Sequence, residues 1–210
     1  MKRLPHSLHQ VAPDAAPRER ILAAARELFY QQGIRAVGVE AIAEAALTNK
    51  MTLYRHFGSK DELVASYLQS LADESEARWQ ALQSAHPNDF PARLEGWLTH
   101  VEEIVNDHGE RGCAMANAAV ELPESDHPAR RIIDQYKTRK RKQLVELFDG
   151  AGYQEPETLA DEVFLLFEGA RIAKQCHNTL DGPASRLIKM LRALLRQHPH
   201  RRPSKRTKHS

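Results

Sequence analysis

The sequence predicts an all-α fold in which three short helices at the N-terminal end precede a larger helical domain. Along nearly all of the 210 residues, apolar side chains recur at spacings of three and four, which is the period of one helix face. Sustained alternation of apolar and polar residues, which would indicate strands, is missing from the sequence. Pro, Gly, Asn and Asp separate the periodic stretches, and these residues favour the ends of helices.

The first three predicted helices follow one another closely. A helix is expected from Arg18 to Gln32, and Gly33 after it favours the left-handed conformation that often ends helices. A second helix is expected from Val39 to Ala46. Asn49 is a good N-cap for a third helix that ends near His56. A turn of three or four residues between the second and third helices is the layout of a helix-turn-helix unit.

The remaining predicted helices are longer and have helix-breaking residues at their ends. Ser59 and Glu62 fit a capping box, in which each side chain bonds a backbone amide of the other residue. The helices expected from this point on are Lys60–Gln83, Phe90–Asp107, Cys113–Leu122, Pro128–Asp149, Pro156–His177 and Pro183–Gln197. Residues 18–65 should then form the helix-turn-helix domain and residues 66–198 the larger domain. The polar, Pro-containing residues 1–17 and 199–210 are expected to be a disordered arm and a disordered basic tail.

Charge is distributed unevenly along the chain. The formal net charge is only +2, yet residues 1–60 carry nine Lys and Arg against five Asp and Glu. Residues 198–210 carry five basic residues and no acidic ones, so the middle of the chain is acidic. A basic N-terminal segment on an acidic body predicts that any nucleic acid is bound by the front of the chain.

The stretch "LTNKMTLYRHFGSK", residues 47–60, has one apolar and one polar side. Leu53 and Phe57 are four residues apart, so they share one helix face and are expected in the core. The other arc can then donate to base edges and phosphates in a DNA major groove, and the start of the next helix offers backbone amides to a phosphate. The alternative is a solvated amphipathic helix without a DNA role. The candidate DNA-binding residues are Lys50, Met51, Thr52, Tyr54, Arg55, His56 and Lys60.

These residues also carry a family resemblance. From Arg18 to Leu68, and most specifically at "TLYRHFGSKDEL", the sequence closely resembles the DNA-binding region of the TetR family of bacterial transcriptional regulators. The resemblance implies an all-helical homodimer with an N-terminal DNA-binding domain and a C-terminal domain for dimerisation and ligand sensing. It further implies that bases are approached by Lys50, Met51, Thr52 and Tyr54, and that phosphates are held by Tyr54, His56 and Lys60. Arg55 stands at a place that varies in the family.

Two positions depart from the family pattern. Leu47 stands where a turn glycine is common, and a residue with a Cβ held at positive φ would cost on the order of 1 kcal/mol. Gly38 stands where Ser or Thr often caps the second helix, and Gly is a slightly poorer cap. Both are expected to lower local stability without changing the fold.

Two helices of the larger domain are apolar on more than one side, at residues 159–176 and 186–197. A helix of a monomer needs only one buried stripe, so the additional apolar surface predicts a homodimer through these last two helices. A DNA-binding protein with one helix-turn-helix unit per chain also usually binds as a dimer, so that two units contact two half-sites of the DNA. The alternative is that both helices are simply central helices of the core.

An effector pocket for an unidentified apolar or amphipathic small molecule is expected between the middle helices. The candidate residues are Trp97, Val101, Ile104, Met115, Asn117, Tyr136, Phe164, Phe167, Glu168 and Arg171. The alternative is that the apolar members are ordinary core, and that Glu168 and Arg171 form an i, i+3 ion pair. The basic run "KTRKRK" at residues 137–142 is expected to be a solvated helix face.

Signatures of other functions are missing from the sequence. GxSxG, Walker A, GxGxxG and HExxH do not occur, so no enzyme, catalytic residue or cofactor is expected. The cysteines and nearby histidines lack metal-ligand spacing, so no metal is expected. No apolar run is long enough for a membrane span or a signal peptide, so the chain is expected in the cytoplasm and not at a membrane.

These patterns together predict a sequence-specific transcriptional regulator, a ligand-responsive repressor that binds a palindromic double-stranded DNA operator as a dimer. Two alternatives remain open at this point. One is an architectural DNA-binding protein that senses nothing and has little sequence preference. The other is a thiol-based redox sensor that uses Cys113 or Cys176, although a buried, inert cysteine is the more ordinary interpretation.

Overall fold

The computed structural model describes residues 15–107, 111–177 and 182–201, and these residues form an all-helical fold. The predicted arm and tail fall mainly at residues 1–14 and 202–210, which lie outside the described residues. The helices are α1 (Pro17–Gln32), α2 (Val39–Ala45), α3 (Lys50–Phe57), α4 (Lys60–Ala85), α5 (Phe90–Asn106), α6 (Ala114–Glu121), α7 (Pro128–Gly150), α8 (Pro156–His177), the 3₁₀ helix η1 (Pro183–Arg186) and α9 (Leu187–Gln197).

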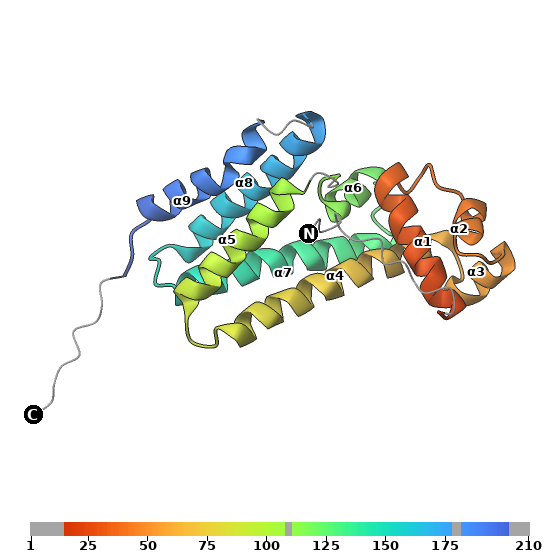
Figure 1. Cartoon of the computed structure of the whole chain (residues 1–210), viewed down its shortest axis with the longest axis horizontal. Coiled ribbons are helices and arrows are strands. Elements are labelled where there is room, and N and C mark those ends of the chain that lie inside the picture. Colours follow the sequence, from red (N-terminus) through yellow and green to blue (C-terminus); the bar gives the residue numbers. More distant parts are fainter. Residues whose placement is uncertain (1–14, 108–110, 178–181, 202–210) are drawn as a thin grey trace, which may run out of the picture.

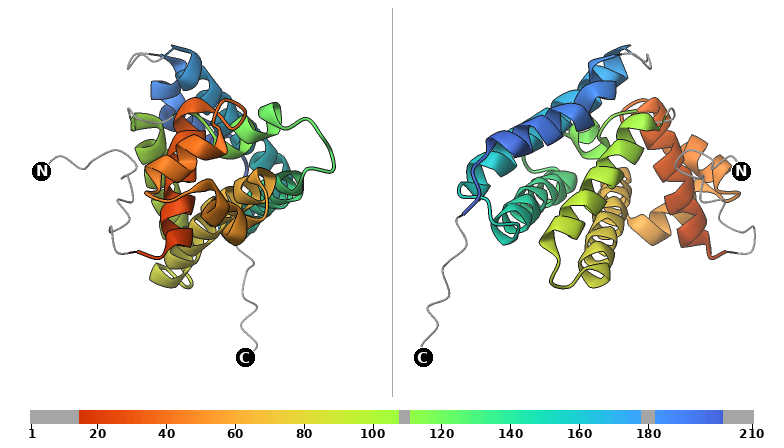
Figure 2. Two further views of the ribbon diagram at one scale, coloured as in Figure 1. Left: turned by 90° about the vertical axis from the view of Figure 1, so that its right-hand side faces the viewer. Right: turned by 60° about the vertical axis from the view of Figure 1, so that its left-hand side comes forward.

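The helices enclose two hydrophobic cores. The first core joins α1, α2, α3 and the first half of α4 to α6 and the start of α7. The second core joins the end of α4 to α5, the rest of α7, α8 and α9. Figure 1 shows the three short helices at one end of the molecule, with α6 beside α1 and the long α4 and α7 running through both parts. Figure 2 shows α8 and α9 side by side on the face of the body away from the short helices.

The start of α4 follows only half of the predicted capping box. The Ser59 hydroxyl accepts from the Glu62 amide at 3.1 Å, as expected. The reciprocal bond to the Ser59 amide is not made by Glu62, because that amide donates to the Phe57 carbonyl at 2.9 Å instead. Ser59 is therefore tied back to α3, and the turn between α3 and α4 is tight.

Two predictions near the C-terminal end need correction. The helix expected from Pro183 begins as 3₁₀, because the Ser185 amide bonds the Gly182 carbonyl three residues back, and α9 proper begins at Leu187. Residues 199–201, expected in a disordered tail, lie along residues 152–154 with backbone hydrogen bonds and an isolated antiparallel bridge between Tyr153 and His200. A polar segment is held there by backbone pairing, which hydrophobic patterning does not reveal.

The turn between α2 and α3 holds Leu47 at a φ of 51°, which confirms the strain expected from the sequence. The Arg20 side chain of α1 fixes this turn, since its Nε donates to the Ala46 carbonyl at 3.0 Å. The Thr48 amide closes the turn on the Ala43 carbonyl at 2.9 Å. Leu47 itself is 76% exposed, so its side chain contributes little to packing.

Replacing Leu47 by Gly is expected to stabilise the protein. Glycine removes the Cβ strain, which stabilises the folded chain by about 1–2 kcal/mol. The greater freedom of Gly in the unfolded chain opposes this gain by about 0.5–1 kcal/mol. The expected net gain is about 0.5–1 kcal/mol in the free energy of unfolding, or a rise of about 1–3 °C in Tm. Thermal unfolding followed by circular dichroism measures it. Leu47→Ala keeps the Cβ and serves as the control, and an equal gain in that variant would contradict the strain.

Candidate nucleic-acid interface

The position of α3 is fixed by its two apolar residues. Leu53 and Phe57 are buried in the first core, as the sequence predicted. Asn49 caps the helix by accepting from the Thr52 amide at 2.9 Å. Arg18 of α1 lies over the Phe57 ring at 5.0 Å from its centroid, which covers the end of the buried face. The opposite arc of α3 therefore faces outward.

Most of the predicted DNA-binding residues lie on that outward arc. Lys50, Met51, Arg55 and His56 are exposed, and Met51 is 76% exposed although it is apolar. An apolar side chain held in water on a short helix fits a contact with a thymine methyl group. Tyr54 is half-buried and packs against the first core, so its ring is anchored while α3 presents its polar arc. The DNA contacts themselves stay predictions.

One acidic residue that sequence reasoning did not single out lies on this surface. Glu40, in the first turn of α2, accepts a hydrogen bond from Lys50 Nζ at 2.7 Å. This contact is the main reason that the pKa of Glu40 is lowered and that of Lys50 raised. Any phosphate or base that binds Lys50 has to compete with Glu40. The sequence did not indicate this contact, because the two residues are ten positions apart and lie on different helices.

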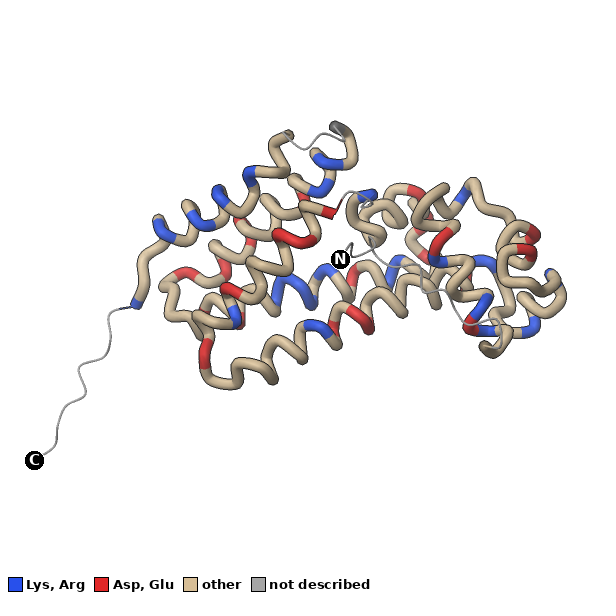
Figure 3. The backbone as a smooth tube through the Cα atoms, in the orientation of Figure 1, with Lys and Arg blue, Asp and Glu red and all other residues tan. Residues whose placement is uncertain are grey.

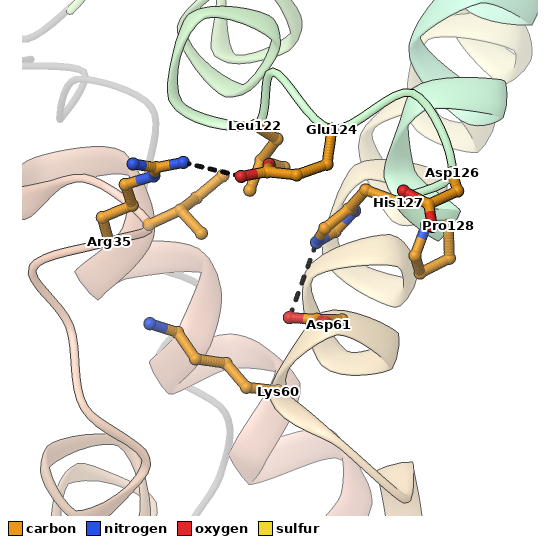
Figure 4. Close-up of a pocket in the computed structure, with 9 residues that line it drawn as sticks. Arg35, Lys60, Asp61, Leu122, Glu124, Asp126, His127 and Pro128 are labelled. Atoms are coloured by element: carbon orange, nitrogen blue, oxygen red, sulfur yellow. Dashed lines mark hydrogen bonds and ion pairs between the residues drawn. The ribbon is translucent and has the colours of Figure 1, made fainter.

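Lys60 is placed differently from the α3 residues. Its side chain is half-buried, with Nζ 6.0 Å from the Phe29 ring centroid, and burial lowers the pKa of its amine. Lys60 lines a cavity of about 420 Å³ between the N-terminal helices and the α6–α7 connection (Figure 4). The contacts of Lys60 and of the backbone amides at the start of α4 with a DNA phosphate stay predictions.

The same cavity contains a contact that joins the two parts of the molecule. His127 caps α7, with Nδ1 accepting from the Ala129 amide at 3.1 Å, which leaves the proton on Nε2. That buried Nε2 lies 3.5 Å from Asp61 Oδ1 in the first turn of α4 (Figure 4). On the other side, Arg35 pairs with Glu124 at 3.1 Å. Polar contacts thus lie beside the hydrophobic contact between α6 and helices α1 to α4.

Basic charge alone does not locate a nucleic-acid surface in this protein. Figure 3 shows a row of Lys and Arg along α9, at the far end of the molecule from α3. One member of that row, Arg192, forms a two-pronged ion pair with Glu95 of α5. The assignment of α3 therefore depends on its geometry, a short helix with one buried edge and a projecting polar arc, more than on charge.

Most of the candidate effector residues are divided between the two hydrophobic cores. Met115 and Tyr136 belong to or pack against the first core, whereas Val101, Trp97, Phe164 and Phe167 belong to or pack against the second. Ile104 is partly buried on α5, and Asn117 donates to the Arg111 carbonyl at 2.8 Å. None of the ten lines the cavity of Figure 4. The pocket stays a prediction.

The i, i+3 pairing weighed for Glu168 and Arg171 is not what the structure shows. Glu168 accepts from Lys137 Nζ at 2.5 Å, and the same Nζ lies 3.3 Å from Cys113 Sγ. Arg171 donates to the Gly112 carbonyl at 2.7 Å. Both residues of α8 thus bond to other elements, since nearer partners on α7 and before α6 are available in three dimensions. Cys113 is buried and Cys176 is exposed.

The basic run at 137–142 is only partly the solvated face that was expected. Arg139, Arg141 and Lys142 are exposed, but Lys137 and Lys140 turn inward. Lys140 Nζ donates to Gln143 Oε1 at 3.0 Å. Desolvation by burial lowers the pKa of Lys140 to about 8, although the carboxylate of Glu76 opposes this shift. The correction follows from helix geometry, since six consecutive residues surround the whole helix and some must face its neighbours.

Comparison with known proteins identifies this arrangement. Residues 21–67, which span α1 to the first part of α4, match the family model described as bacterial regulatory proteins, tetR family. The N-terminal domain of this chain is therefore that of a TetR-family regulator. Members are transcriptional regulators, which are not enzymes, and their N-terminal helix-turn-helix domain implies DNA binding.

Similarity to individual TetR-family proteins extends beyond the matched domain. The HTH-type transcriptional repressor KstR2 of Mycobacterium tuberculosis is 27% identical over 150 residues, which cover 70% of this chain and 74% of KstR2. The HTH-type transcriptional activator FasR of Mycolicibacterium smegmatis is 43% identical over 89 residues, 40% of each chain. The crystal structure of SCO4454, a TetR-family transcriptional regulator from Streptomyces coelicolor, superposes with a TM-score of 0.79 at 26% identity, covering 86% of this chain and 95% of that one.

Membrane spans and metal-binding clusters are both missing from the described residues. None of the described helices is both long and apolar enough to cross a membrane. Within residues 15–107, 111–177 and 182–201, no group of three or more His, Cys, Asp and Glu is arranged to hold a metal ion. Repressors and activators both occur among the relatives, so the family alone leaves the sign of regulation open.

Neutralising Glu40 is expected to strengthen binding to DNA. Glu40→Gln releases Lys50 and removes a negative charge beside the reading helix, so affinity for a random-sequence duplex should rise about threefold at low salt. Fluorescence anisotropy at ~50 and ~200 mM salt measures the gain, which should shrink at the higher salt. Glu44→Gln removes a charge from the same helix and is the control. An equal gain in both variants would show that charge alone, without release of Lys50, is responsible.

Lys140 is expected to make stability depend on pH in the alkaline range. Because its pKa is about 8 in the folded chain and 10.5 ordinarily, the unfolded chain binds more protons at this site between these values. Its contribution to the free energy of unfolding therefore rises with pH across that window. Lys140→Met should be more stable than the parent at pH 7, and this advantage should shrink from pH 8 to 10.5. Urea unfolding at each pH measures it, with the exposed Lys142→Met as control. A constant difference would contradict the shift.

Proposed function

We propose that this TetR-family regulator is a ligand-responsive repressor that binds a palindromic operator as a homodimer. The observation that carries the proposal is the geometry of α3, which buries Leu53 and Phe57 and projects a polar arc with the exposed Met51. The eight-residue length of α3 suits insertion into a major groove, where its first residues meet base edges. The contacts proposed for this arc are those of Lys50, Met51, Thr52, Tyr54, Arg55 and His56, with Lys60 and the start of α4 at the phosphates.

Dimerisation is proposed through α8 and α9. Leu165 is 68% exposed, and Ile172 on the same helix and Met190 on α9 are each 46% exposed. Nothing lies within 4 Å of the position that a Cβ on Gly169 would occupy, so a second helix can approach α8 closely there. Two copies joined by a two-fold axis at this face would carry two reading helices, and a two-fold protein reads a palindrome.

The effector is proposed to bind among the candidate residues between the middle helices. Two cations already lie on the aromatic rings of α8, with Lys137 Nζ 5.6 Å from the Phe164 centroid and Arg171 Cζ 5.6 Å from that of Phe167. An apolar or amphipathic molecule that separates these contacts would favour a conformation of the dimer with a different spacing of its reading helices. Its differential affinity for the two conformations would then weaken operator binding.

The first test is a selection of bound sequences from a random duplex library by the full-length protein. Enrichment of a palindrome, bound at least ~10³-fold more tightly than scrambled DNA, is the expected result. Tyr54→Phe keeps the anchored ring and removes the hydroxyl, so operator affinity measured by anisotropy should fall about tenfold. Tyr153→Phe, in the turn before α8, is the control. Equal binding of all sequences would instead support an architectural DNA-binding protein.

The dimer face gives a second prediction. Leu165→Glu introduces a charge into the proposed interface, and analytical ultracentrifugation should show monomers at concentrations where the parent chain is dimeric. Val120→Glu on α6 is the matched control, because Val120 is 83% exposed but lies outside α8 and α9. A dimer that survives Leu165→Glu, or one that both substitutions disrupt, would contradict this interface.

A further inference from the structure

Three elements meet at one backbone carbonyl in front of α6. The Gly112 carbonyl accepts from Arg171 Nη2 of α8 at 2.7 Å and from the Tyr30 hydroxyl of α1 at 3.3 Å. The Tyr30 oxygen in turn accepts from the Arg111 amide at 2.6 Å. Arg111 also reaches the Tyr30 carbonyl with Nη1 at 3.2 Å. A residue of the body and a residue of the DNA-binding domain are therefore joined through residues 111 and 112.

The geometry at Gly112 requires that residue to be glycine. Its φ is +75°, and a Cβ there would lie 2.6 Å from Gln175 Oε1 and 3.8 Å from the Arg171 carbonyl. Both contacts belong to α8, so the backbone before α6 lies directly against that helix. Gly112 and Cys113 are also buried. A close, buried contact transmits a displacement better than an exposed one, because packed atoms have little room to move independently.

The far end of α6 is bound to the DNA-binding domain as well. Glu121 Oε2 accepts from the Arg35 amide at 2.9 Å, and Glu124 beyond the helix pairs with the Arg35 side chain. Between these two ends, α6 buries Met115 and Ala118 in the core of the DNA-binding helices. The eight-residue α6 is thus attached to α1 and the following loop along its whole length, and it should move with them as one body.

Arg171 connects this body to the helix proposed for dimerisation. The exposed residues Leu165 and Ile172 flank it on α8, and its guanidinium also lies over the Phe167 ring. A rotation or shift of α8 therefore carries the Arg171 donor with it and pulls on the Gly112 carbonyl. In a dimer, the orientation of α8 is fixed relative to the partner's α8, so this contact would set the angle at which each reading helix is held.

We propose that Arg171 and Tyr30 are positioning residues that act in series through the Gly112 carbonyl, coupling the α8 face to the orientation of the DNA-binding domain. The inference extends the proposed function, since it names the contact through which dimer geometry, and any effector bound against α8, would reach α3. It does not require the effector to be known. The charged donor on one side, Arg171 Nη2, and the Tyr30 hydroxyl on the other make the contact directional.

Amide hydrogen exchange on the full-length protein tests the coupling without DNA. Arg171→Met keeps the length of the apolar stem and removes the donor. Amides of residues 30–35 in the DNA-binding domain, far from position 171 in sequence, should then exchange about fivefold faster, the size expected for one hydrogen bond. Arg192→Met, which removes an arginine from α9 and its pair with Glu95, is the control and should leave residues 30–35 unchanged.

The outcomes separate coupling from a general loss of stability. Arg171→Lys retains a cationic donor and should restore most of the protection at residues 30–35. Faster exchange confined to α8 and residues 111–113 would overturn the proposal. Faster exchange of equal size throughout the chain would also overturn it, because a merely structural role lowers protection everywhere.

Operator affinity supplies an independent readout. Tyr30→Phe and Arg171→Met should each weaken binding to the selected duplex by about fivefold, and the double variant should lose no more than the larger single loss. If the loss of affinity in the double variant equals the product of the two single losses, the residues have separate roles, which would contradict action in series. If no operator is found, the proposed function fails while the exchange result stands, so the two failures are distinguishable.

Discussion

The rest of the structure depends on the burial of α6 in the core of the DNA-binding helices. Met115, Ala118 and Leu122 pack with the same residues that hold α3 in place. Because α6 closely follows Gly112, which lies against α8, this packing contact connects the DNA-binding domain to the body in addition to the covalent path through α4. The DNA-binding domain and the body are therefore joined by packing between helices as well as by the continuous chain of α4.

The presentation of α3 is a consequence of packing combined with local electrostatics. Two buried residues fix the helix, and Arg20 and the strained Leu47 fix the turn before it. The polar arc that results is not uniformly free, since Lys50 donates a hydrogen bond to Glu40. This contact weakens the attraction of Lys50 to any DNA, because it breaks only where a base or phosphate replaces Glu40. The competition lowers overall affinity and favours discrimination between DNA sequences.

Charged residues also lie between the helices of the body. Lys137 bridges α7 to α8 through Glu168, and Lys140 remains desolvated beside α4 with a lowered pKa. Such groups cost stability compared with apolar residues of the same size, so their presence between helices that are proposed to move suggests a role in switching between arrangements. The hydrogen bond from Arg171 to Gly112 belongs to the same set of contacts.

The sequence by itself determined the local features of this protein. Helix period, breakers and caps placed the helices within a few residues, and the four-residue spacing of Leu53 and Phe57 oriented α3. The positive φ of Leu47 was expected from the family resemblance, in which a turn glycine is common at that position. These properties depend on neighbours a few positions away, so they can be read along the chain. Tertiary structure alone decided that α6 packs with the DNA-binding helices and that Lys60 lines a cavity. It also decided that Glu40 accepts a hydrogen bond from Lys50, and that Glu168 and Arg171 bond to other elements. Those partners lie far apart in sequence, and only the packing of helices against one another brings them within hydrogen-bond distance.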